Sequence, residues 1–222
     1  MEPLPDLPAP PRDLVDHLHA QGLVNAHPRF ETLYGGRTNR VWKVKGRDND
    51  KVLKLYSTAL RNPLFRNDAE LEAQCLKALG TTGFVPRLRA TGQYKEARWV
   101  FYDHAPGAPW RQDSAQVGAL LRKLHTLPIA VQAPVGCNGS ADLRAHGNRI
   151  LQGCTSHGRD KLADLQPTNP VAPMERTCLI HGDPVAGNIL VATGGLTLID
   201  WQCPALGDPC EDLALFLSPA IS

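Results

Sequence analysis

The sequence predicts an α+β fold, with antiparallel strands mainly in its first half and mostly helices in its second half. Two observations support this prediction. Over residues 41–56, two sets of side chains alternate with a period of two, as they do in paired strands. Over residues 114–127, apolar residues recur every three or four positions, as they do on one face of a helix. The chain of 222 residues is long enough to bury a core.

The composition excludes several kinds of partner. The net charge is +2 and there is no dense run of basic residues, so we expect no nucleic-acid partner. The N-terminus lacks a basic segment followed by an apolar one, and no apolar stretch is long enough to span a bilayer. We therefore expect a cytoplasmic protein without a membrane partner. The six cysteines show no CxxC spacing, which favours reduced thiols over disulfides or zinc.

The N-terminal segment 1–11 is rich in proline and is expected to be an extended or disordered lead-in. A short helix follows, because Leu14, Leu18 and Leu23 have nearly helical spacing. The two alternating runs within 41–56 come next, and the polar sequence GRDND separates them. They predict a β-hairpin.

A glycine-rich turn precedes the hairpin and is a candidate phosphate-binding loop. Two adjacent glycines allow a phosphate to approach the backbone closely, and polar residues after them can add hydrogen-bond donors. The residues are Gly35, Gly36, Thr38 and Asn39. A simple turn before a strand is the alternative.

A second helix is predicted around Leu71, Cys75 and Leu79, which share one face, with Asn67 or Asp68 as its N-cap. Two further strands follow, and Pro and Gly accumulate from residue 103 to residue 109. This stretch marks the expected boundary between two parts of the molecule. The helix over 114–127 then begins the second part.

Three short apolar runs near the C-terminus predict a strand, a loop and a hairpin. Asp183 lies in the loop, Asn188 stands where the chain re-enters a strand, and Asp200 follows the last strand. Because all three lie at strand ends, their side chains can converge on one point. Such a set suits phosphoryl transfer, which needs a carboxylate to orient a hydroxyl and oxygen ligands for Mg²⁺. The alternative is that Asp183 and Asn188 only cap a turn.

The spacing of these residues carries a family resemblance. The motifs are HGD-x-x-x-x-N over 181–188, IDW over 199–201 and GDP-x-x-DLA over 207–214. Together they resemble the aminoglycoside phosphotransferase and choline kinase family, the small-molecule kinases that share the protein-kinase fold. The resemblance implies a two-lobed protein-kinase-like fold, in which Asp183 is the catalytic base. It makes Asn188 and Asp200 the magnesium ligands.

The same resemblance assigns the nucleotide-binding residues. Lys54 matches the strand lysine that holds the α- and β-phosphates of ATP, and Glu72 on the following helix is its expected partner, with Glu70 as the fallback. Phe101 and Tyr102 fall where the backbone of the family holds adenine between the lobes. The glycine turn matches the loop over the phosphates.

The implied organisation is a lead-in over 1–11, an N-lobe over 12–102 with an antiparallel sheet and one main helix, and a mostly helical C-lobe over 103–222 with the catalytic hairpin. The implied reaction moves the γ-phosphate of ATP, with Mg²⁺, to a hydroxyl of a small metabolite. Acceptors of the choline, ethanolamine, thiamine or aminoglycoside type all fit. A metal-dependent hydrolase is disfavoured, because it would not need the clamp of Lys54 and Glu72.

Residues 129–177 correspond to the region that helps to shape the acceptor pocket in the resembled family. Two helical pieces are expected there, and four polar side chains are candidates for acceptor contacts, with a solvated helix face as the alternative. They are Asp142, Arg144, His146 and Arg149.

This sequence departs from the family pattern after residue 214. The family continues with more helices there, whereas this sequence ends at Ser222. Three expectations follow. The acceptor pocket is unusually open, a second subunit completes it in a homodimer, or the chain is a shortened pseudokinase that binds nucleotide without turnover.

Overall fold

The computed structural model describes residues 9–33, 38–58, 66–128 and 131–218. Most of the predicted lead-in lies outside the described residues. Gly35 and Gly36 of the predicted phosphate loop lie outside them too. Every cysteine falls inside and has a free thiol, as expected.

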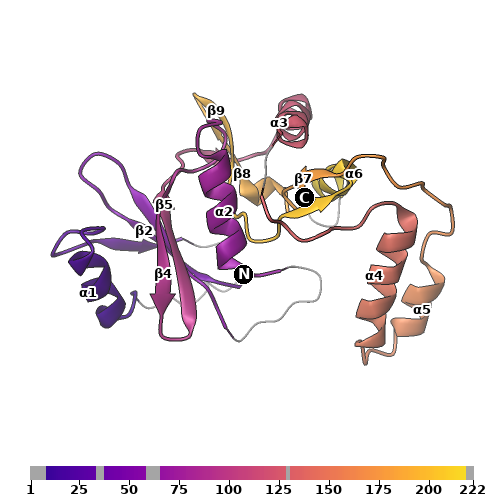
Figure 1. Ribbon diagram of the computed structural model, residues 1–222, viewed down its shortest axis with the longest axis horizontal. Coiled ribbons are helices and arrows are strands. Elements are labelled where there is room, and N and C mark those ends of the chain that lie inside the picture. The colour runs from indigo at the N-terminus through magenta and orange to yellow at the C-terminus, as the bar shows by residue number, and fades with distance from the viewer. Residues whose placement is uncertain (1–8, 34–37, 59–65, 129–130, 219–222) are drawn as a thin grey trace.

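The N-terminal part is built on an antiparallel five-stranded sheet with the order β1-β2-β3-β5-β4 (Figure 1). The predicted hairpin is confirmed, because β2 pairs with β3 and places Trp42 opposite Leu53. The strands are β1 (Phe30–Thr32), β2 (Arg40–Val44), β3 (Lys51–Leu55), β4 (Leu88–Tyr94) and β5 (Ala97–Asp103).

A helix covers each face of this sheet. The α2 helix (Ala69–Leu79) lies on one face, while α1 (Arg12–Ala20) packs on the other (Figure 1). The buried face next to α1 is apolar and aromatic, with Leu53, Trp99 and Phe101 in contact with the helix leucines. Because paired residues of neighbouring strands share a face, the next residue of β3, Lys54, points to the side of α2.

The C-terminal part combines helices with two small sheets. The predicted strand, loop and hairpin are confirmed, since β8 pairs with β9 after a single 3₁₀ turn. The sequence did not indicate that β10 pairs antiparallel with β7. The elements are β6 (Ala108–Pro109), α3 (Ser114–Thr126), β7 (Cys178–Ile180), η1 (Ala186–Asn188), β8 (Ile189–Ala192), β9 (Gly195–Leu198), β10 (Ala205–Gly207) and α6 (Pro209–Leu217).

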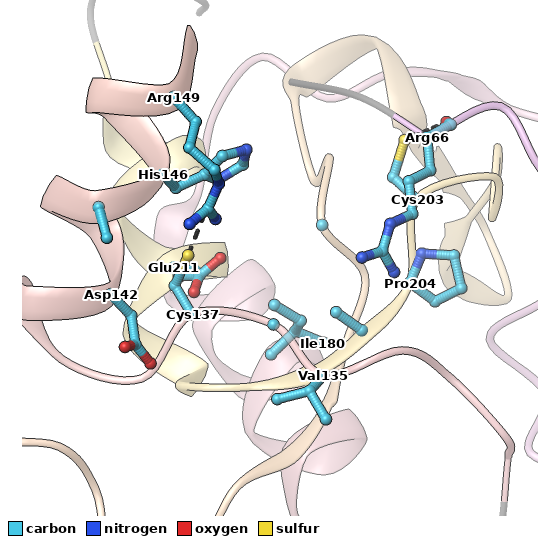
Figure 2. A pocket seen from close by; sticks show the side chains of 14 residues that line it. Arg66, Val135, Cys137, Asp142, His146, Arg149, Ile180, Cys203, Pro204 and Glu211 are labelled. Atoms are coloured by element: carbon cyan, nitrogen blue, oxygen red, sulfur yellow. Dashed lines mark hydrogen bonds between the residues drawn. The ribbon is translucent and has the colours of Figure 1, made fainter. Parts of the chain in front are cut away.

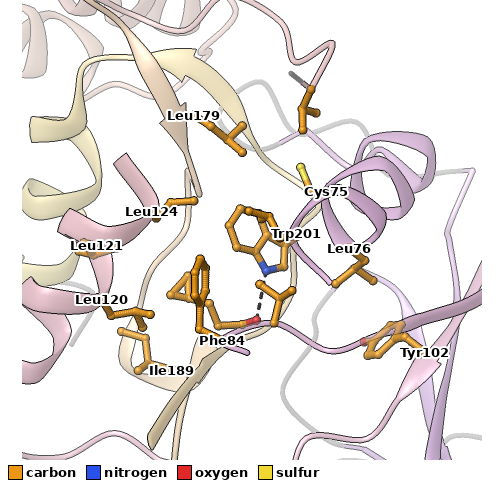
Figure 3. Packing of buried hydrophobic residues seen from close by; sticks show 14 of the residues in the cluster. Cys75, Leu76, Phe84, Tyr102, Leu120, Leu121, Leu124, Leu179, Ile189 and Trp201 are labelled. Carbon is orange, nitrogen blue, oxygen red and sulfur yellow. Dashed lines mark hydrogen bonds between the residues drawn. The ribbon is translucent and has the colours of Figure 1, made fainter. Parts of the chain in front are cut away.

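One hydrophobic cluster joins the two parts. Trp201 is fully buried between Leu76 and Cys75 of α2 and Leu124 of α3, and its indole N–H donates to the carbonyl of Leu198 at 3.1 Å (Figure 3). Phe84 enters the same cluster from the connection between α2 and β4. Because Trp201 directly follows Asp200, this packing fixes the start of the segment after the hairpin of β8 and β9.

The two predicted helical pieces within 129–177 are α4 (Ser140–Gln152) and α5 (Arg159–Asp164). Neither helix has a buried residue, and the pair lies at the end of the molecule opposite α1 (Figure 1). None of the helices in the described ranges has the length and apolar character needed to span a membrane.

Candidate active site

Lys54 is the most deeply buried cation of the site. Its side chain is 4% exposed, and its ammonium lies 2.7 Å from Oε2 of Glu72 and in contact with Oδ1 of Asp200. Burial disfavours the charged ammonium, but the Asp200 and Glu72 carboxylates outweigh it and raise the pKa of Lys54. Lys54 therefore stays protonated and links β3, α2 and the end of the catalytic hairpin.

The sequence-based pairing of Lys54 with Glu72 is confirmed, while the fallback Glu70 lies on the surface and pairs with Arg98 at 3.2 Å. Glu72 is placed by α2, which begins where Asp68 accepts hydrogen bonds from the N–H groups of Glu70 and Leu71 at 2.9 and 3.1 Å. Of the two N-cap candidates, Asp68 is thus the one observed.

Tyr56 is a site residue that sequence reasoning missed. It follows β3 two residues after Lys54, is buried, and its hydroxyl donates to Oε2 of Glu72. The ammonium of Lys54 lies 4.9 Å from the centre of the Tyr56 ring. Glu72 Oε2 thus receives both an ammonium and a phenol, whereas the buried Oε1 has no hydrogen-bond partner among the described residues. Spacing along a strand could have flagged Tyr56, since residues i and i+2 share a face.

Asp183 and Asn188 are joined by hydrogen bonds across the loop of residues 181–188, which the family resemblance identifies as the catalytic loop. The side-chain amide of Asn188 donates to Oδ2 of Asp183 at 3.1 Å and to its backbone carbonyl at 2.9 Å. Both bonds use the amide nitrogen of Asn188, so its side-chain carbonyl oxygen can still serve as a metal ligand. Burial and the nearby Asp200 raise the pKa of Asp183 to about 6.

His181 holds the loop in place through two hydrogen bonds of its buried ring. It is fully buried, and burial lowers its pKa, so its ring is neutral. The N–H of Asp183 donates to His181 Nδ1 at 3.2 Å, which leaves Nε2 as the protonated nitrogen that donates to the carbonyl of Ile199 at 3.0 Å. His181 therefore connects the residue before Asp200 directly to Asp183.

Asp212 anchors the same loop from α6. Its carboxylate is fully buried and accepts the N–H groups of His181 and Gly182, each at 2.9 Å. The ring of His125 on α3 lies 2.9 Å from the same carboxylate. Asp212 thus joins α6 and α3 to the loop that carries Asp183. Gly182 has φ +80°, and a Cβ there would lie 2.2 Å from the carbonyl oxygen of Cys203, so glycine is required at this position.

Asp200 adopts a left-handed backbone conformation with φ +66°, which is uncommon for a residue other than glycine. The N–H of Ile199 donates to the carbonyl of Asn188 at 2.9 Å, so Asp200 and Asn188 stand at neighbouring strand ends. Carboxylate and amide oxygens are the donors that Mg²⁺ prefers. No cluster of three or more His, Cys, Asp or Glu side chains suited to a metal occurs within the described ranges. A magnesium ion here would thus be held by Asn188, Asp200 and phosphate oxygens.

The side chain of Asn39, which the sequence suggested as a phosphate ligand, is instead engaged in hydrogen bonds within the protein. Its amide exchanges two hydrogen bonds with the amide of Asn67, donates to Oε1 of Gln202 at 2.8 Å and accepts the N–H of Ser57 at 3.0 Å. These contacts use both donors and both acceptors of the side chain. The side chain thus connects the sheet to the start of α2 and to the segment after Asp200, and it has no donor left for a phosphate.

The two predicted adenine-contacting residues point to opposite faces of β5. Phe101 packs in the cluster next to α1, whereas Tyr102 lies on the side of Lys54. On that side of the sheet, burial and the Glu72 carboxylate raise the pKa of the Tyr102 phenol. A contact of Phe101 with a nucleotide at this site would have to come from its backbone, as the sequence suggested.

This fold and this arrangement of groups define a protein-kinase-like phosphotransferase. The phosphotransferase enzyme family matches residues 29–221, and the chain belongs to that family. No curated protein matches the chain.

Solved structures with the same fold include enzymes that phosphorylate small molecules. A type VIII aminoglycoside-3'-phosphotransferase is 22% identical, with coverage of 89% of this chain and 80% of that chain and a TM-score of 0.61. A protein of the choline/ethanolamine kinase family from Mesorhizobium loti is 19% identical, with 91% and 69% coverage and a TM-score of 0.61. A spectinomycin phosphotransferase, solved with ADP and spectinomycin, is 18% identical, with 94% and 74% coverage and a TM-score of 0.61.

Proposed function

We propose that this protein transfers the γ-phosphoryl group of ATP to a hydroxyl of a small molecule. The observation that carries this proposal is the buried contact of Lys54 with both Glu72 and Asp200, next to the linked pair of Asp183 and Asn188. A buried ammonium between two carboxylates on separate elements costs desolvation energy, which favours a functional reason for keeping it.

On the nucleotide side, Lys54 is proposed to bind the α- and β-phosphates while Glu72 holds its ammonium in place. The backbone of β5 around Phe101 and Tyr102 is proposed to receive adenine. Thr38, together with the glycine turn, is proposed to close over the phosphates. Mg²⁺, once bound, would supply charge neutralisation between the phosphates.

On the acceptor side, Asp183 is proposed to accept the proton of the hydroxyl. The hydroxyl oxygen forms a bond to the γ-phosphorus, the bond between that phosphorus and the β–γ bridging oxygen breaks, and ADP leaves with the bond's electron pair. A carboxyl with a pKa of about 6 is mostly ionised at neutral pH and can still take up a proton during the reaction. The hydrogen bond from Asn188 holds the carboxylate towards the acceptor.

The acceptor classes proposed from the sequence are choline, ethanolamine, thiamine and aminoglycosides. Among proteins of the same fold, one is described with ADP and spectinomycin and another with AMP-PNP and hygromycin B. The division at residues 102 and 103, a cytoplasmic location and a homodimer remain part of the proposal.

The test is calorimetric titration with ATP, with and without Mg²⁺, on the original protein, Asp183→Asn and Asp200→Ala. Asp183→Asn is expected to bind ATP within a few-fold of the original affinity and to lose at least 100-fold in transfer, the lower range of general-base effects. Asp200→Ala should lose magnesium-dependent binding. Turnover retained in Asp183→Asn would remove Asp183 as the base. Nucleotide binding without turnover on any acceptor would favour the pseudokinase alternative.

A further inference from the structure

A cavity of about 260 Å³ opens beside the catalytic loop. One side is formed by α4 with His146 and Arg149, and the other by Arg66 together with Cys203 and Pro204 (Figure 2). Gly182 also lines the cavity, and Asp183 directly follows Gly182 in the chain. The cavity therefore borders the loop that carries Asp183. Its volume is just below the range of roughly 300–1,000 Å³ typical of small-molecule pockets, which suits a small acceptor or one end of a larger one.

Two guanidinium groups enter this cavity from opposite sides. Arg149 belongs to α4, whereas Arg66 precedes α2, and no ion pair joins either one to another of the described residues. Arg144 on the same helix behaves differently, since its guanidinium donates to the carbonyl of Pro167. The two cavity arginines are thus not held in ion pairs with the described residues and can meet a ligand.

The two carboxyl groups of the cavity, Asp142 and Glu211, neutralise part of the charge of these arginines. Oδ2 of Asp142 accepts the N–H of Asn138 at 3.0 Å and so caps the turn before α4. Glu211 has a buried oxygen with no hydrogen-bond partner among the described residues. Burial and the neighbouring Asp212 and Asp208 raise the pKa of Glu211 to about 7, so a large share of this carboxyl is protonated at neutral pH. At neutral pH the two arginines therefore exceed the ionised carboxyl groups of the lining, and the cavity carries a small net positive charge.

We infer that this cavity binds an acidic group of the acceptor, a carboxylate or a phosphate, between Arg66 and Arg149. Guanidinium groups bind both kinds of anion through paired charge-assisted hydrogen bonds. A polycationic acceptor would meet two unpaired guanidiniums here and would be repelled. This inference rests on the proposed phosphoryl transfer, since it concerns the acceptor whose hydroxyl faces Asp183. It replaces the choline, ethanolamine, thiamine and aminoglycoside types, which are all cationic, with an acidic alcohol as the acceptor class.

A second consequence follows from the place of Glu211 in the lining of the same cavity. A bound anion favours the protonated carboxyl, so binding should weaken as the pH rises through about 7, and Glu211→Gln should reduce that dependence. The charged and titratable groups that face Glu211 are Cys137, Asp142, His146, Arg149, Asp208 and Asp212.

The experiment compares three hydroxyl probes of the same carbon skeleton and different charge. Glycerol, 2-aminopropane-1,3-diol and glycerol 3-phosphate are titrated into the full chain saturated with Mg²⁺ and ADP, which occupies the nucleotide site. Glycerate is added as a fourth probe and distinguishes a carboxylate from a phosphate. Arg66→Gln and Arg149→Gln test the cavity, and Arg144→Gln is the matched control on the same helix.

The expected result is that an anionic probe binds at least ten-fold tighter than glycerol and the amine. Each cavity variant should lose about ten-fold or more of that affinity, as expected for a hydrogen bond between charged groups, while Arg144→Gln stays unchanged. Equal binding of all probes, no binding of the anions, or anion binding unaffected by Arg149→Gln would overturn the inference. Binding that follows the expected pattern without phosphoryl transfer would leave the inference standing and count against the proposed function instead.

Discussion

At the scale of single residues, the position of the Lys54 ammonium depends on the groups that donate hydrogen bonds to Oε2 of Glu72. The ammonium of Lys54 and the hydroxyl of Tyr56 both contact this oxygen, and all three side chains are buried. A hydrogen bond to a charged acceptor contributes roughly 1.5–3 kcal/mol. Tyr56 is therefore a positioning residue, which limits the directions in which Glu72 can hold Lys54.

Tyr56→Phe removes the hydroxyl and keeps the ring beneath Lys54. We expect the free energy of unfolding to fall by about 1–3 kcal/mol, and ATP affinity to fall by roughly three- to ten-fold because Lys54 is held less firmly. Calorimetric titration with Mg²⁺ and ATP measures the second effect. Tyr94→Phe is the matched control, since the Tyr94 hydroxyl contacts Asp13 on the surface at 2.6 Å. ATP affinity that is the same in both variants would show that Tyr56 has only a structural role.

At the scale of elements, the position of α2 decides where Glu72 lies. The helix is held at its start by the cap at Asp68 and by the amide pair of Asn39 and Asn67. The amide of Asn39 also reaches Gln202, two residues after Asp200. One set of hydrogen bonds thus aligns the sheet, the helix and the segment that follows Asp200.

Removal of the cap should loosen this alignment. Asp68→Ala is expected to lower the free energy of unfolding by about 0.5–2 kcal/mol, because two backbone N–H groups at the start of α2 lose their acceptor. Asp68→Asn keeps a capping oxygen and is expected to stay within a few tenths of a kcal/mol of the original protein. Urea denaturation followed by circular dichroism measures both. An equal loss in the two variants would show that charge, and not capping, is what Asp68 supplies.

At the scale of the whole molecule, one hydrophobic cluster spans both parts. Leu76 of α2, Phe84, Leu124 of α3 and Trp201 belong to the same contiguous core (Figure 3). Burial of these side chains couples the sheet to the catalytic hairpin, so the two parts are expected to unfold together. The exposed pair of α4 and α5 stands outside this core.

Leu124→Ala tests the coupling. The side chain is 1% exposed, so the truncation should cost about 2–5 kcal/mol and shift the whole unfolding transition. Tryptophan fluorescence and circular dichroism should report the same midpoint in urea. Leu217→Ala on the surface of α6, where the side chain is 67% exposed, is the control and should change little. Two separate transitions in the original protein would contradict a shared core.

Local spacing was enough to predict the groups of the catalytic loop. Asp183, Asn188 and Asp200 lie at the ends of short strands that are close in sequence, so the order of strand, loop and hairpin brings them together with little help from the rest of the chain. The alternation within 41–56 likewise predicted the central hairpin. The pairing with Glu72 came from the family resemblance.

The remaining features depend on residues that are far apart along the chain. Asn39 meets Gln202, β10 pairs with β7, and Arg66 faces Arg149 across the cavity, and in each case the partners are brought together only when the sheet and the helices pack. Periodicity reports which face of an element is buried, but it carries no information about which distant polar group that face will meet. The charge of the cavity that we propose for the acceptor is therefore a property of the tertiary structure alone.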